Sequence, residues 1–200
     1  MERDRDPTVR SGDGIVYLDL AHDDYACRYD PEEPALAYAQ SMASAGGAGL
    51  DTTRPMLASR WTDPQPNDFP RPSLAHGISF LAALCRAAIG LRGRSVAELA
   101  TRAQQLRTRS GAALMTAEQA SNLFRYLLSF MPFTPRCLLS SYALLHFLAA
   151  QGLRADWVFG VQLFPFRAHC WVASGDLLLN ELRHCIEDYA VIWTVAPQRP

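Results

Sequence analysis

A proline-rich segment divides the chain into two parts of unequal length. Four prolines, at positions 64, 66, 70 and 72, lie between Thr62 and Ser73. Proline fixes φ and lacks the backbone N–H donor, so this segment resists both helix and sheet and is typical of a semi-rigid connector. A chain of 200 residues accommodates one or two domains. We therefore predict two units, residues 1–62 and 74–200, joined by a linker over 63–73.

The first unit begins with the pattern of a β-hairpin. Residues 15–20 and 25–29 are rich in strand-forming side chains, and a polar turn separates them. The acidic, proline-bearing segment 30–34 ends the second strand and predicts a helix over about 35–44, which a glycine-rich segment at 45–49 ends. The first unit is therefore expected to contain a small sheet and at least one helix.

The second unit has a run of predicted helices followed by a run of predicted strands. Helices are expected at 73–89, 96–109, 116–130 and 136–151. The second has the Ser95 and Glu98 spacing of a capping box, and the fourth ends at Gly152. Strands are expected at 155–163, 169–173, 177–180 and 190–195, the middle two joined by a Ser-Gly-Asp turn. This order predicts an α+β fold.

Charge is distributed unevenly along a chain whose net charge is -1. Residues 1–33 contain ten acidic residues against four arginines, and residues 71–167 contain eleven arginines against three acidic residues. A basic stretch can bind nucleic acid or lipid, but no run of consecutive basic residues occurs and the arginines suit a solvated helix face. We therefore interpret the split as a mark of two-module construction and expect no nucleic-acid partner.

The chain contains no lysine, which excludes a Schiff-base lysine and a Walker-type ATP site. Its apolar stretches fall short of the ~20 residues that a membrane-spanning helix needs, and its first ten residues lack the apolar segment of a secretory signal. We expect a cytoplasmic protein without membrane contact and without a cofactor. Five cysteines with no CxxC pair favour buried thiols or one catalytic thiol.

Two adjacent His-Cys pairs, at positions 169–170 and 184–185, raise the possibility of a zinc site. Neighbouring residues of a strand point to opposite faces, so such a pair does not easily send both side chains to one metal. We therefore predict no metal site. His146, on an apolar predicted helix, is interpreted as a core histidine.

Three residues have the order of a cysteine hydrolase site. Cys137 lies in the first turn of a predicted helix, where the backbone N–H groups and the helix dipole favour the thiolate and can hold an oxyanion. His169 begins a predicted strand, and Glu181 lies twelve residues later on the strand expected to pair with it. A nucleophile, a base and an orienting carboxylate are the parts that such catalysis requires. Asp176 and Glu187 are alternative orienting groups, and Cys137 could instead be a buried core thiol.

The sequence context of this trio resembles a known family. Pro135-Arg136-Cys137-Leu138-x-x-Ser141, then Gly160-Val161-x-x-x-Pro165-Phe166-x-Ala168-His169-x-Trp171-Val172, then Asn180-Glu181, resembles the transglutaminase-like leader peptidases of lasso peptide biosynthesis, the B proteins, over about residues 75–195. The N-terminal Gly14-Ile-Val-Tyr-Leu-Asp19-Leu-x-x-x-x-Tyr25 resembles their recognition element. The resemblance implies a papain-like (transglutaminase-like) cysteine peptidase domain fused to a winged-helix-like domain with a three-stranded sheet.

The resemblance also implies the reaction and the partners. Cys137 would attack the scissile carbonyl of a lasso precursor peptide and remove its leader, His169 would take and return the proton, and Glu181 would orient His169. An ATP-dependent, asparagine-synthetase-like cyclase would then form the macrolactam. Two positions depart from the family pattern, because Glu181 stands where the family has Asp and Cys170 stands where it has a small residue.

Substrate contacts are expected from five residues of the two units: Tyr17, Asp19, Tyr25, Phe166 and Trp171. A strand-forming leader peptide could add to an edge of the first sheet, and the neighbouring acidic residues would favour a basic leader segment. For Trp171 and Phe166, core packing is an equally good interpretation. Two other functions stay open: acyl transfer to an amine through the same thioester, and non-catalytic escort of a peptide.

Overall fold

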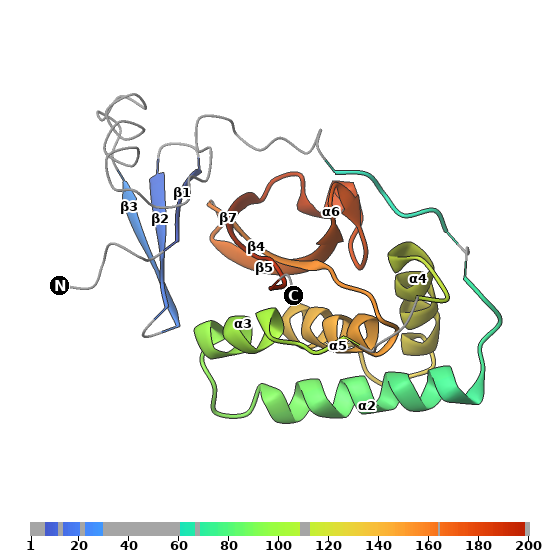
Figure 1. The fold of residues 1–200 in the computed structure, drawn as a ribbon. Coiled ribbons are helices and arrows are strands. Elements are labelled where there is room, and N and C mark those ends of the chain that lie inside the picture. The colour runs from blue at the N-terminus through green and yellow to red at the C-terminus, as the bar shows by residue number, and fades with distance from the viewer. Residues whose placement is uncertain are drawn as a thin grey trace.

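The structure is a computed structural model that describes residues 7–11, 14–20, 23–29, 61–66, 69–108, 113–163 and 165–198 (Figure 1). A first, antiparallel sheet contains β1 (Thr8–Ser11), β2 (Gly14–Asp19) and β3 (Asp24–Tyr29) in that order. The predicted hairpin is confirmed, with Leu18 opposite Tyr25. The residue pattern did not predict β1, although the resemblance implied three strands. The predicted helix over 35–44 lies outside the described residues.

Four longer helices follow: α2 (Leu74–Gly90), α3 (Val96–Gln104), α4 (Ala117–Leu128) and α5 (Cys137–Ala150). Capping boxes begin the first three, each formed by a serine or threonine and the residue three positions into the helix. Gly152, with φ of 81°, follows α5. There the Leu153 and Gly152 N–H groups donate to the carbonyls of Leu148 and Ala149, which is a Schellman motif.

Helix α3 is shorter than predicted, because it ends at Gln104 and not near residue 109. Its last turn tightens, with the Leu106 N–H donating to the Ala103 carbonyl. Leu106 then packs against the main core. The Gln104 carbonyl accepts a hydrogen bond from the Gln198 N–H, so the C-terminal segment occupies the position that another helical turn would need.

The second sheet contains β4 (Asp156–Gln162), β5 (Arg167–Ser174), β6 (Leu177–Leu178) and β7 (Ala190–Val195), with a short helix α6 (Arg183–Ile186) before β7. The strand order is β6-β5-β4-β7, and every pair is antiparallel. The prediction of a strand over 177–180 is wrong in its extent, because β6 ends at Leu178. The α+β order of helices followed by strands is confirmed.

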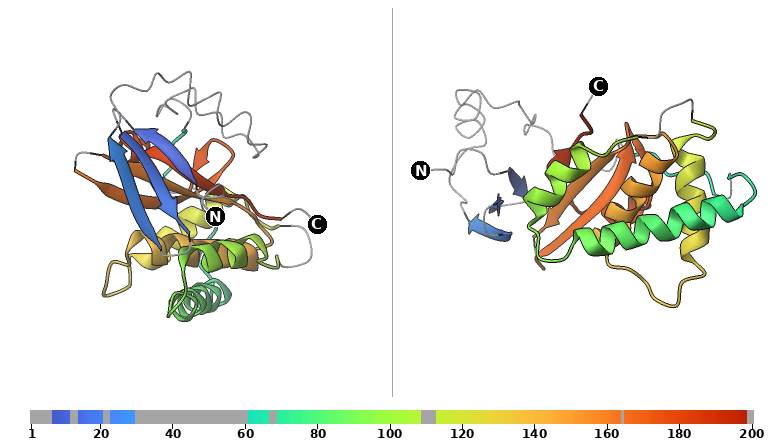
Figure 2. Two further views of the ribbon diagram at one scale, coloured as in Figure 1. Left: turned by 90° about the vertical axis from the view of Figure 1, so that its left-hand side faces the viewer. Right: turned by 60° about the horizontal axis from the view of Figure 1, so that its bottom comes forward.

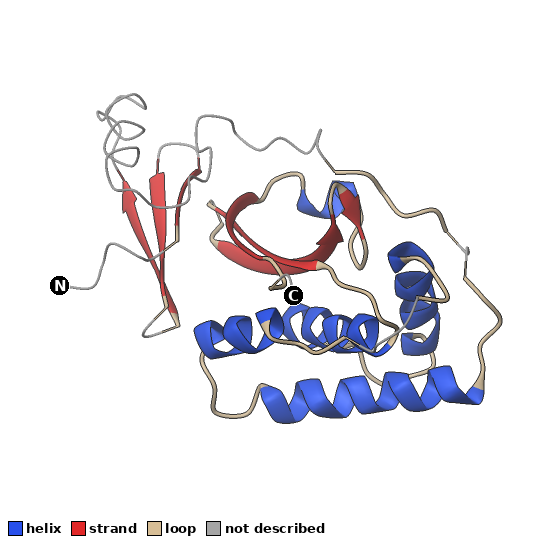
Figure 3. Ribbon diagram, viewed as in Figure 1, coloured by secondary structure: helices blue, strands red, loops and turns tan. Residues whose placement is uncertain are grey.

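Helices α2 to α5 lie together on one face of the second sheet (Figures 2 and 3), whereas Ile186 of α6 belongs to the core on the other face. Alternate residues of β5 enter two hydrophobic cores, because successive side chains of a strand point to opposite faces. Cys170 and Val172 face the main core with α5, whereas Trp171 and Ala173 face a smaller one. Among the described residues, no helix combines the length and the apolar character needed to cross a membrane.

The proline-rich segment is attached to the second unit. Trp61 is buried against Trp171, with the two rings edge to face. The Thr62 N–H donates to the Asp176 carbonyl, and the Leu178 N–H donates to the Thr62 carbonyl. Trp61 and Thr62, assigned to the first unit above, therefore extend the second sheet, while the two-unit division stays a prediction. The described residues 63–66 and 69–73 form neither helix nor strand.

The first sheet is docked onto the second unit. Val16 and Leu18 of β2 belong to the same buried cluster as α2, α4 and α5. Both carboxylate oxygens of Asp23 accept the Val96 N–H, at 2.7 and 2.9 Å, at the N-terminus of α3. A carboxylate in this position satisfies an unpaired amide and complements the helix dipole. Asp23, one of the acidic residues expected to favour a basic leader, thus binds a helix of this chain.

We expect Asp23→Ala to lower the free energy of unfolding by about 1 kcal/mol, the usual cost of losing a helix cap. Urea unfolding followed by circular dichroism measures it. Glu187→Ala, at an exposed residue after α6, is the matched control and should change little. Equal losses in both variants would contradict a docking role for Asp23.

Candidate active site

Cys137 is the first residue of α5, directly after the segment that separates α4 from α5. Its N-cap residue, Arg136, makes no side-chain capping hydrogen bond. The amides of the first turn therefore keep donors for another acceptor, and the positive end of the dipole is at the sulfur. The Cys137 side chain is half-buried. This is the environment in which a cysteine becomes a nucleophile.

His169 and Glu181 are in direct contact. His169 lies near the start of β5, opposite Gly160 of β4, and its Nε2 is 3.0 Å from Oε1 of Glu181. Because Nε2 is occupied by the carboxylate, Nδ1 is the ring nitrogen available for the hydrogen bond that His169 makes with Cys137. The structure therefore brings together the nucleophile, base and carboxylate that the sequence predicted.

Glu181 reaches His169 from a bend and not from a paired strand, which corrects the expected geometry. After β6 the Leu179 N–H still donates to the Val172 carbonyl at 3.0 Å. The Asn180 side chain then takes the place of a backbone acceptor from a paired strand, because its Oδ1 accepts the Val172 N–H at 2.7 Å. This contact fixes the backbone one residue before Glu181. The other orienting candidates, Asp176 and Glu187, are exposed in the turn before β6 and after α6.

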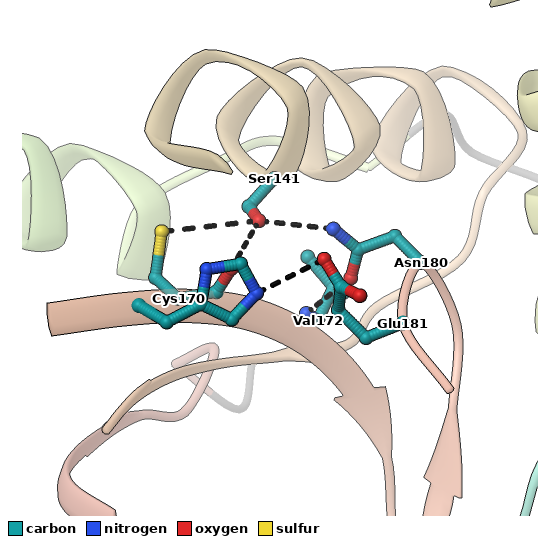
Figure 4. Close-up of polar contacts among 6 residues, drawn as sticks. Ser141, Cys170, Val172, Asn180 and Glu181 are labelled. Carbon is teal, nitrogen blue, oxygen red and sulfur yellow. Dashed lines mark hydrogen bonds and ion pairs between the residues drawn. The ribbon is translucent and has the colours of Figure 1, made fainter. Parts of the chain in front are cut away.

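Ser141 joins the helix that carries Cys137 to the strand that carries His169. It is fully buried, one turn after Cys137 in α5. Its Oγ donates to the Cys170 carbonyl and accepts from Asn180 Nδ2, both at 3.0 Å. Figure 4 shows Ser141 between Cys170 and Asn180, with Glu181 beside them. One hydroxyl thus links α5, β5 and the segment that positions Glu181.

The pKa of Cys137 is lowered to about 4. The largest cause is a hydrogen bond from the Cys170 side chain, followed by one from His169 and by the positive charge of His169, while burial acts in the opposite direction. Cys170 has the complementary change, because donating to Cys137 and burial both raise its pKa well above the ordinary value. Cys137 is therefore the thiolate of this pair and Cys170 the thiol.

The pKa of His169 is raised to about 9, first by its hydrogen bond to Cys137 and then by its hydrogen bond to Glu181. The burial of the ring acts against this increase. Between about pH 4 and pH 9 the site accordingly holds a thiolate and an imidazolium. Such a pair has a nucleophile ready to attack and an acid ready to protonate a leaving amine.

We expect the alkylation rate of Cys137 by iodoacetamide to be nearly constant between about pH 5 and pH 8, because the thiolate persists down to a pKa of about 4. Below that value the sulfur is protonated and the rate should fall. N-acetylcysteine, an ordinary thiol, should instead lose about tenfold in rate for each unit below its pKa of about 8.5. A Cys137 rate that followed the profile of N-acetylcysteine would contradict the ion pair.

We expect Ser141→Ala to slow alkylation of Cys137 at pH 5 by about 10-fold to 100-fold, because looser packing of Cys170 and His169 on α5 would raise the pKa of Cys137 and protonate the sulfur. It should also cost about 1–3 kcal/mol of stability, because the Asn180 amide loses its buried acceptor. Ser140→Ala, the same change at the neighbouring half-buried serine, is the control. A positioning role also predicts a narrower pH plateau, and an unchanged plateau would indicate a purely structural role.

Two of the five expected substrate-contact residues meet near the thiol. The rings of Tyr25 in β3 and Phe166 in the β4–β5 turn have centroids 5.4 Å apart. The pKa of Tyr25 is raised to about 12, by burial first and then by electrostatic interactions with Cys170, Cys137 and Asp23. Tyr25 therefore keeps its phenolic proton, and the first sheet contributes a wall beside the thiol.

The other three lie elsewhere. Tyr17 pairs with Ala26 across the first sheet and has the opposite side-chain direction to Leu18 and Tyr25. Asp19 follows two residues later and shares the direction of Tyr17. Trp171 is fully buried against Trp61, which corrects its assignment to a substrate groove. A Cβ on Gly160 would lie 2.7 Å from the Trp171 ring, so the glycine makes room for the indole.

A pocket of about 340 Å³ opens on the α4 side of Cys137. Its wall includes the end of α4, the segment before Cys137, the first turn of α5, and Asn180: Phe124, Arg125, Leu128, Ser129, Met131, Phe133, Thr134, Pro135, Ser140 and Asn180. Because Pro135 lies two residues before Cys137 and Asn180 immediately precedes Glu181, this pocket adjoins the site. The sequence reasoning did not identify it.

The sequence motif contained Ser141 and Asn180, but it predicted no role for them. Cys170 was noted only as a departure from the family pattern. The signal available was their position, since Asn180 precedes Glu181 and Ser141 follows Cys137 by one helical turn.

In the described part of the chain, no group of three His, Cys, Asp or Glu side chains has the arrangement of metal ligands. His146 packs edge to face on Tyr142, and burial lowers its pKa to about 4.

A thiolate at a helix N-terminus, a histidine on a strand and a carboxylate on that histidine define a class: enzymes that form a thioester through a cysteine. Residues 81–194 match the family model of the transglutaminase-like superfamily, which covers more than half of the chain. The chain belongs to this superfamily. Comparisons with curated proteins and with solved structures found no significant match.

Proposed function

We propose that this protein is a cysteine peptidase that removes the leader from a ribosomally made lasso precursor peptide. The observation that carries the proposal is the Cys137, His169 and Glu181 arrangement, together with a first sheet whose Tyr25 packs on Phe166 of the β4–β5 turn, three residues before His169. The resemblance of both sequence segments to the B proteins of lasso peptide biosynthesis supplies the substrate class. The family match supports the coarser activity, a cysteine peptidase or acyltransferase.

In the proposed reaction, the Cys137 thiolate attacks the carbonyl carbon of the scissile bond and the carbonyl oxygen becomes an oxyanion. Amides of the first turn of α5 are suited to hold that oxyanion. The His169 imidazolium then protonates the leaving amine as the C–N bond breaks, which leaves a thioester on Cys137. Neutral His169 next takes a proton from water, whose oxygen attacks the thioester and releases the leader carboxylate.

The first sheet suits recognition of an extended peptide. Among the described residues, β3 has a pairing partner on one side only, because it ends the order β1-β2-β3. An extended leader can add to such an edge by backbone hydrogen bonds. Tyr25 of β3 packs on Phe166, in the turn before the strand that carries His169, so a peptide bound to β3 would extend toward the site. The pocket on the α4 side can take a side chain near the scissile bond.

The proposed product requires a partner, because the freed core amine must be joined to a side-chain carboxylate. Activation of that carboxylate consumes ATP, and this chain has no lysine with which to build a Walker-type site. We therefore assign that step to an ATP-dependent, asparagine-synthetase-like cyclase.

Mass spectrometry tests the proposal. The purified chain is incubated with the precursor peptide encoded beside its gene, with and without the neighbouring cyclase. We expect the precursor to split into a leader with a free carboxylate and a core with a free amine, and the core to lose one water when the cyclase and ATP are present. An intact precursor under both conditions would overturn the proposal.

Acyl transfer to an amine is the second candidate, because the family match covers acyltransferases as well as peptidases. The same thioester would then react with an amine instead of water. Adding a primary amine such as glycine methyl ester to the incubation separates the two functions. A peptidase should still release the free acid as its main product, whereas an acyltransferase should release the amide.

A further inference from the structure

The catalytic thiol has a second thiol beside it. Cys170 directly follows His169 in β5, and its side chain points to the face of the sheet that α5 covers. It is 2% exposed. Interaction with Cys137 is the largest cause of the raised pKa of Cys170, which agrees with a position next to that thiol. The reaction proposed above assigns no chemical step to Cys170, so a buried nucleophilic group lies unused at the centre of the site.

The surroundings hold the Cys170 sulfur in place. Its backbone carbonyl accepts the Ser141 hydroxyl at 3.0 Å, and its Sγ lies 3.9 Å from the same oxygen. Ser141 is on the helix that begins with Cys137. One buried hydroxyl therefore keeps the strand segment that carries Cys170 against the first turns of α5. The Cys170 sulfur thus lies against the helix whose first residue is Cys137.

The two sulfurs also differ in access. Cys137 is half-buried, whereas Cys170 is almost completely buried. An oxidant from solvent thus meets Cys137 first. A reactive, accessible thiolate with a neighbouring second thiol is the arrangement of reversible thiol oxidation, in which the second cysteine resolves the first oxidation product.

We propose that Cys137 and Cys170 form a site of reversible oxidation that reacts with hydroperoxides and closes to an internal disulfide. The Cys137 thiolate attacks the terminal oxygen of the hydroperoxide, the O–O bond breaks, and the departing alkoxide takes the proton of the His169 imidazolium and leaves as the alcohol. Cys137 is then a sulfenic acid. Cys170 gives up its proton and attacks that sulfur, the S–O bond breaks, and the proton leaves with hydroxide as water.

Both sulfurs are oxidised in this sequence and one hydroperoxide is reduced by two electrons. The disulfide removes the nucleophile and so stops acyl transfer, and a dithiol restores both thiols by exchange. The disulfide also protects Cys137 from the sulfinic and sulfonic acids, which thiols do not reverse. Cys170 is thereby a resolving residue, and the site has an oxidised, inactive state that is recoverable.

The lack of lysine makes the test direct, because trypsin cuts this chain only after arginine. Cys137 is recovered in the fragment 137–154 and Cys170 in the fragment 168–183. The full chain is treated with one equivalent of hydrogen peroxide, its remaining thiols are blocked with N-ethylmaleimide, and the unreduced digest is analysed by mass spectrometry. We expect these two fragments joined, at the summed mass less two hydrogens.

Labelling by iodoacetamide gives a second readout. After peroxide, labelling of Cys137 should fall by about tenfold or more and return on treatment with dithiothreitol. With two equivalents of hydrogen peroxide, the unsubstituted chain should still regain labelling, whereas Cys170→Ala should not, because its unresolved sulfenic acid consumes the second equivalent and becomes a sulfinic acid. Each sample is compared with its own untreated rate. Cys185→Ala, which removes an exposed cysteine, should form the disulfide as the unsubstituted chain does.

A sulfinic acid at Cys137 of the unsubstituted chain, with no joined fragments, would overturn the proposal. So would a disulfide between Cys137 and any cysteine other than Cys170. The joined fragments are sought in the unsubstituted chain, so this result does not depend on how a variant folds. The readouts use no peptide substrate, and failure of the leader-peptidase proposal would leave this result unaffected.

Discussion

Replacing Cys137 by alanine is expected to abolish cleavage of the precursor peptide while its binding stays nearly unchanged. The substitution removes the sulfur that forms the thioester, so the rate should fall by about 10⁴-fold or more, as for other covalent catalysts. Binding should persist because β3 and its open edge belong to the first sheet. Cleavage is measured by mass spectrometry, and binding by the fluorescence anisotropy of a labelled leader peptide.

Cys185→Ala is the matched control, because it removes a thiol that is exposed and lies after the site in α6. It should cleave at the rate of the unsubstituted chain. Cleavage that persists in Cys137→Ala, or that is lost equally in Cys185→Ala, would place the nucleophile elsewhere. Loss of binding together with cleavage in Cys137→Ala would contradict the separation of recognition from chemistry.

Local rules predicted much of this fold from sequence. Ser95 with Glu98 marks the start of α3 by a capping box, and Gly152 marks the end of α5 because its positive φ suits glycine. Cys137 and His169 were found in the same way, since one begins a helix and the other lies near the start of a strand. Each of these features depends on residues only a few positions apart.

Contacts between distant segments could not be predicted by such rules. Trp171 is buried because Trp61, more than a hundred residues earlier, packs on its ring. Asp23 caps a helix that begins at Val96. Successive side chains of a strand point to opposite faces, which correctly divides the side chains of β5 into two sets. This rule does not reveal which set is buried in a core and which lines a groove.

The position of Glu181 was predicted in part from the local sequence and depends in part on contacts that the sequence did not predict. Its sequence distance from His169 predicted the pairing of the two side chains, and they are in contact at 3.0 Å. The expected mechanism, continuous pairing of two strands, is wrong because β6 has only two residues. A side-chain amide holds the bend instead, through Val172 and Ser141. Pattern reasoning does not detect an amide that substitutes for a backbone ladder.

Glu181→Gln is expected to lower kcat by about 100-fold or more, whereas Glu181→Asp should lower it by only about three- to tenfold. Glutamine keeps an oxygen that can accept from Nε2 but removes the negative charge. That charge helps to raise the pKa of His169, so the upper limit of the pH plateau should move downward from about 9. Aspartate keeps the charge and loses one methylene, which a small adjustment after Asn180 can offset.

Asp176→Asn tests whether the effect belongs to Glu181. Asp176 is exposed in the turn before β6, and the asparagine variant keeps its size while removing its charge. Its kcat and its pH profile should match those of the unsubstituted chain. If Asp176→Asn lost as much activity as Glu181→Gln, the orienting carboxylate would be Asp176. A charge next to the ring changes the pH at which the His169 imidazolium loses its proton. If Glu181→Gln lost activity without a shift of the pH profile, the Glu181 carboxylate would therefore support folding and would not act on His169.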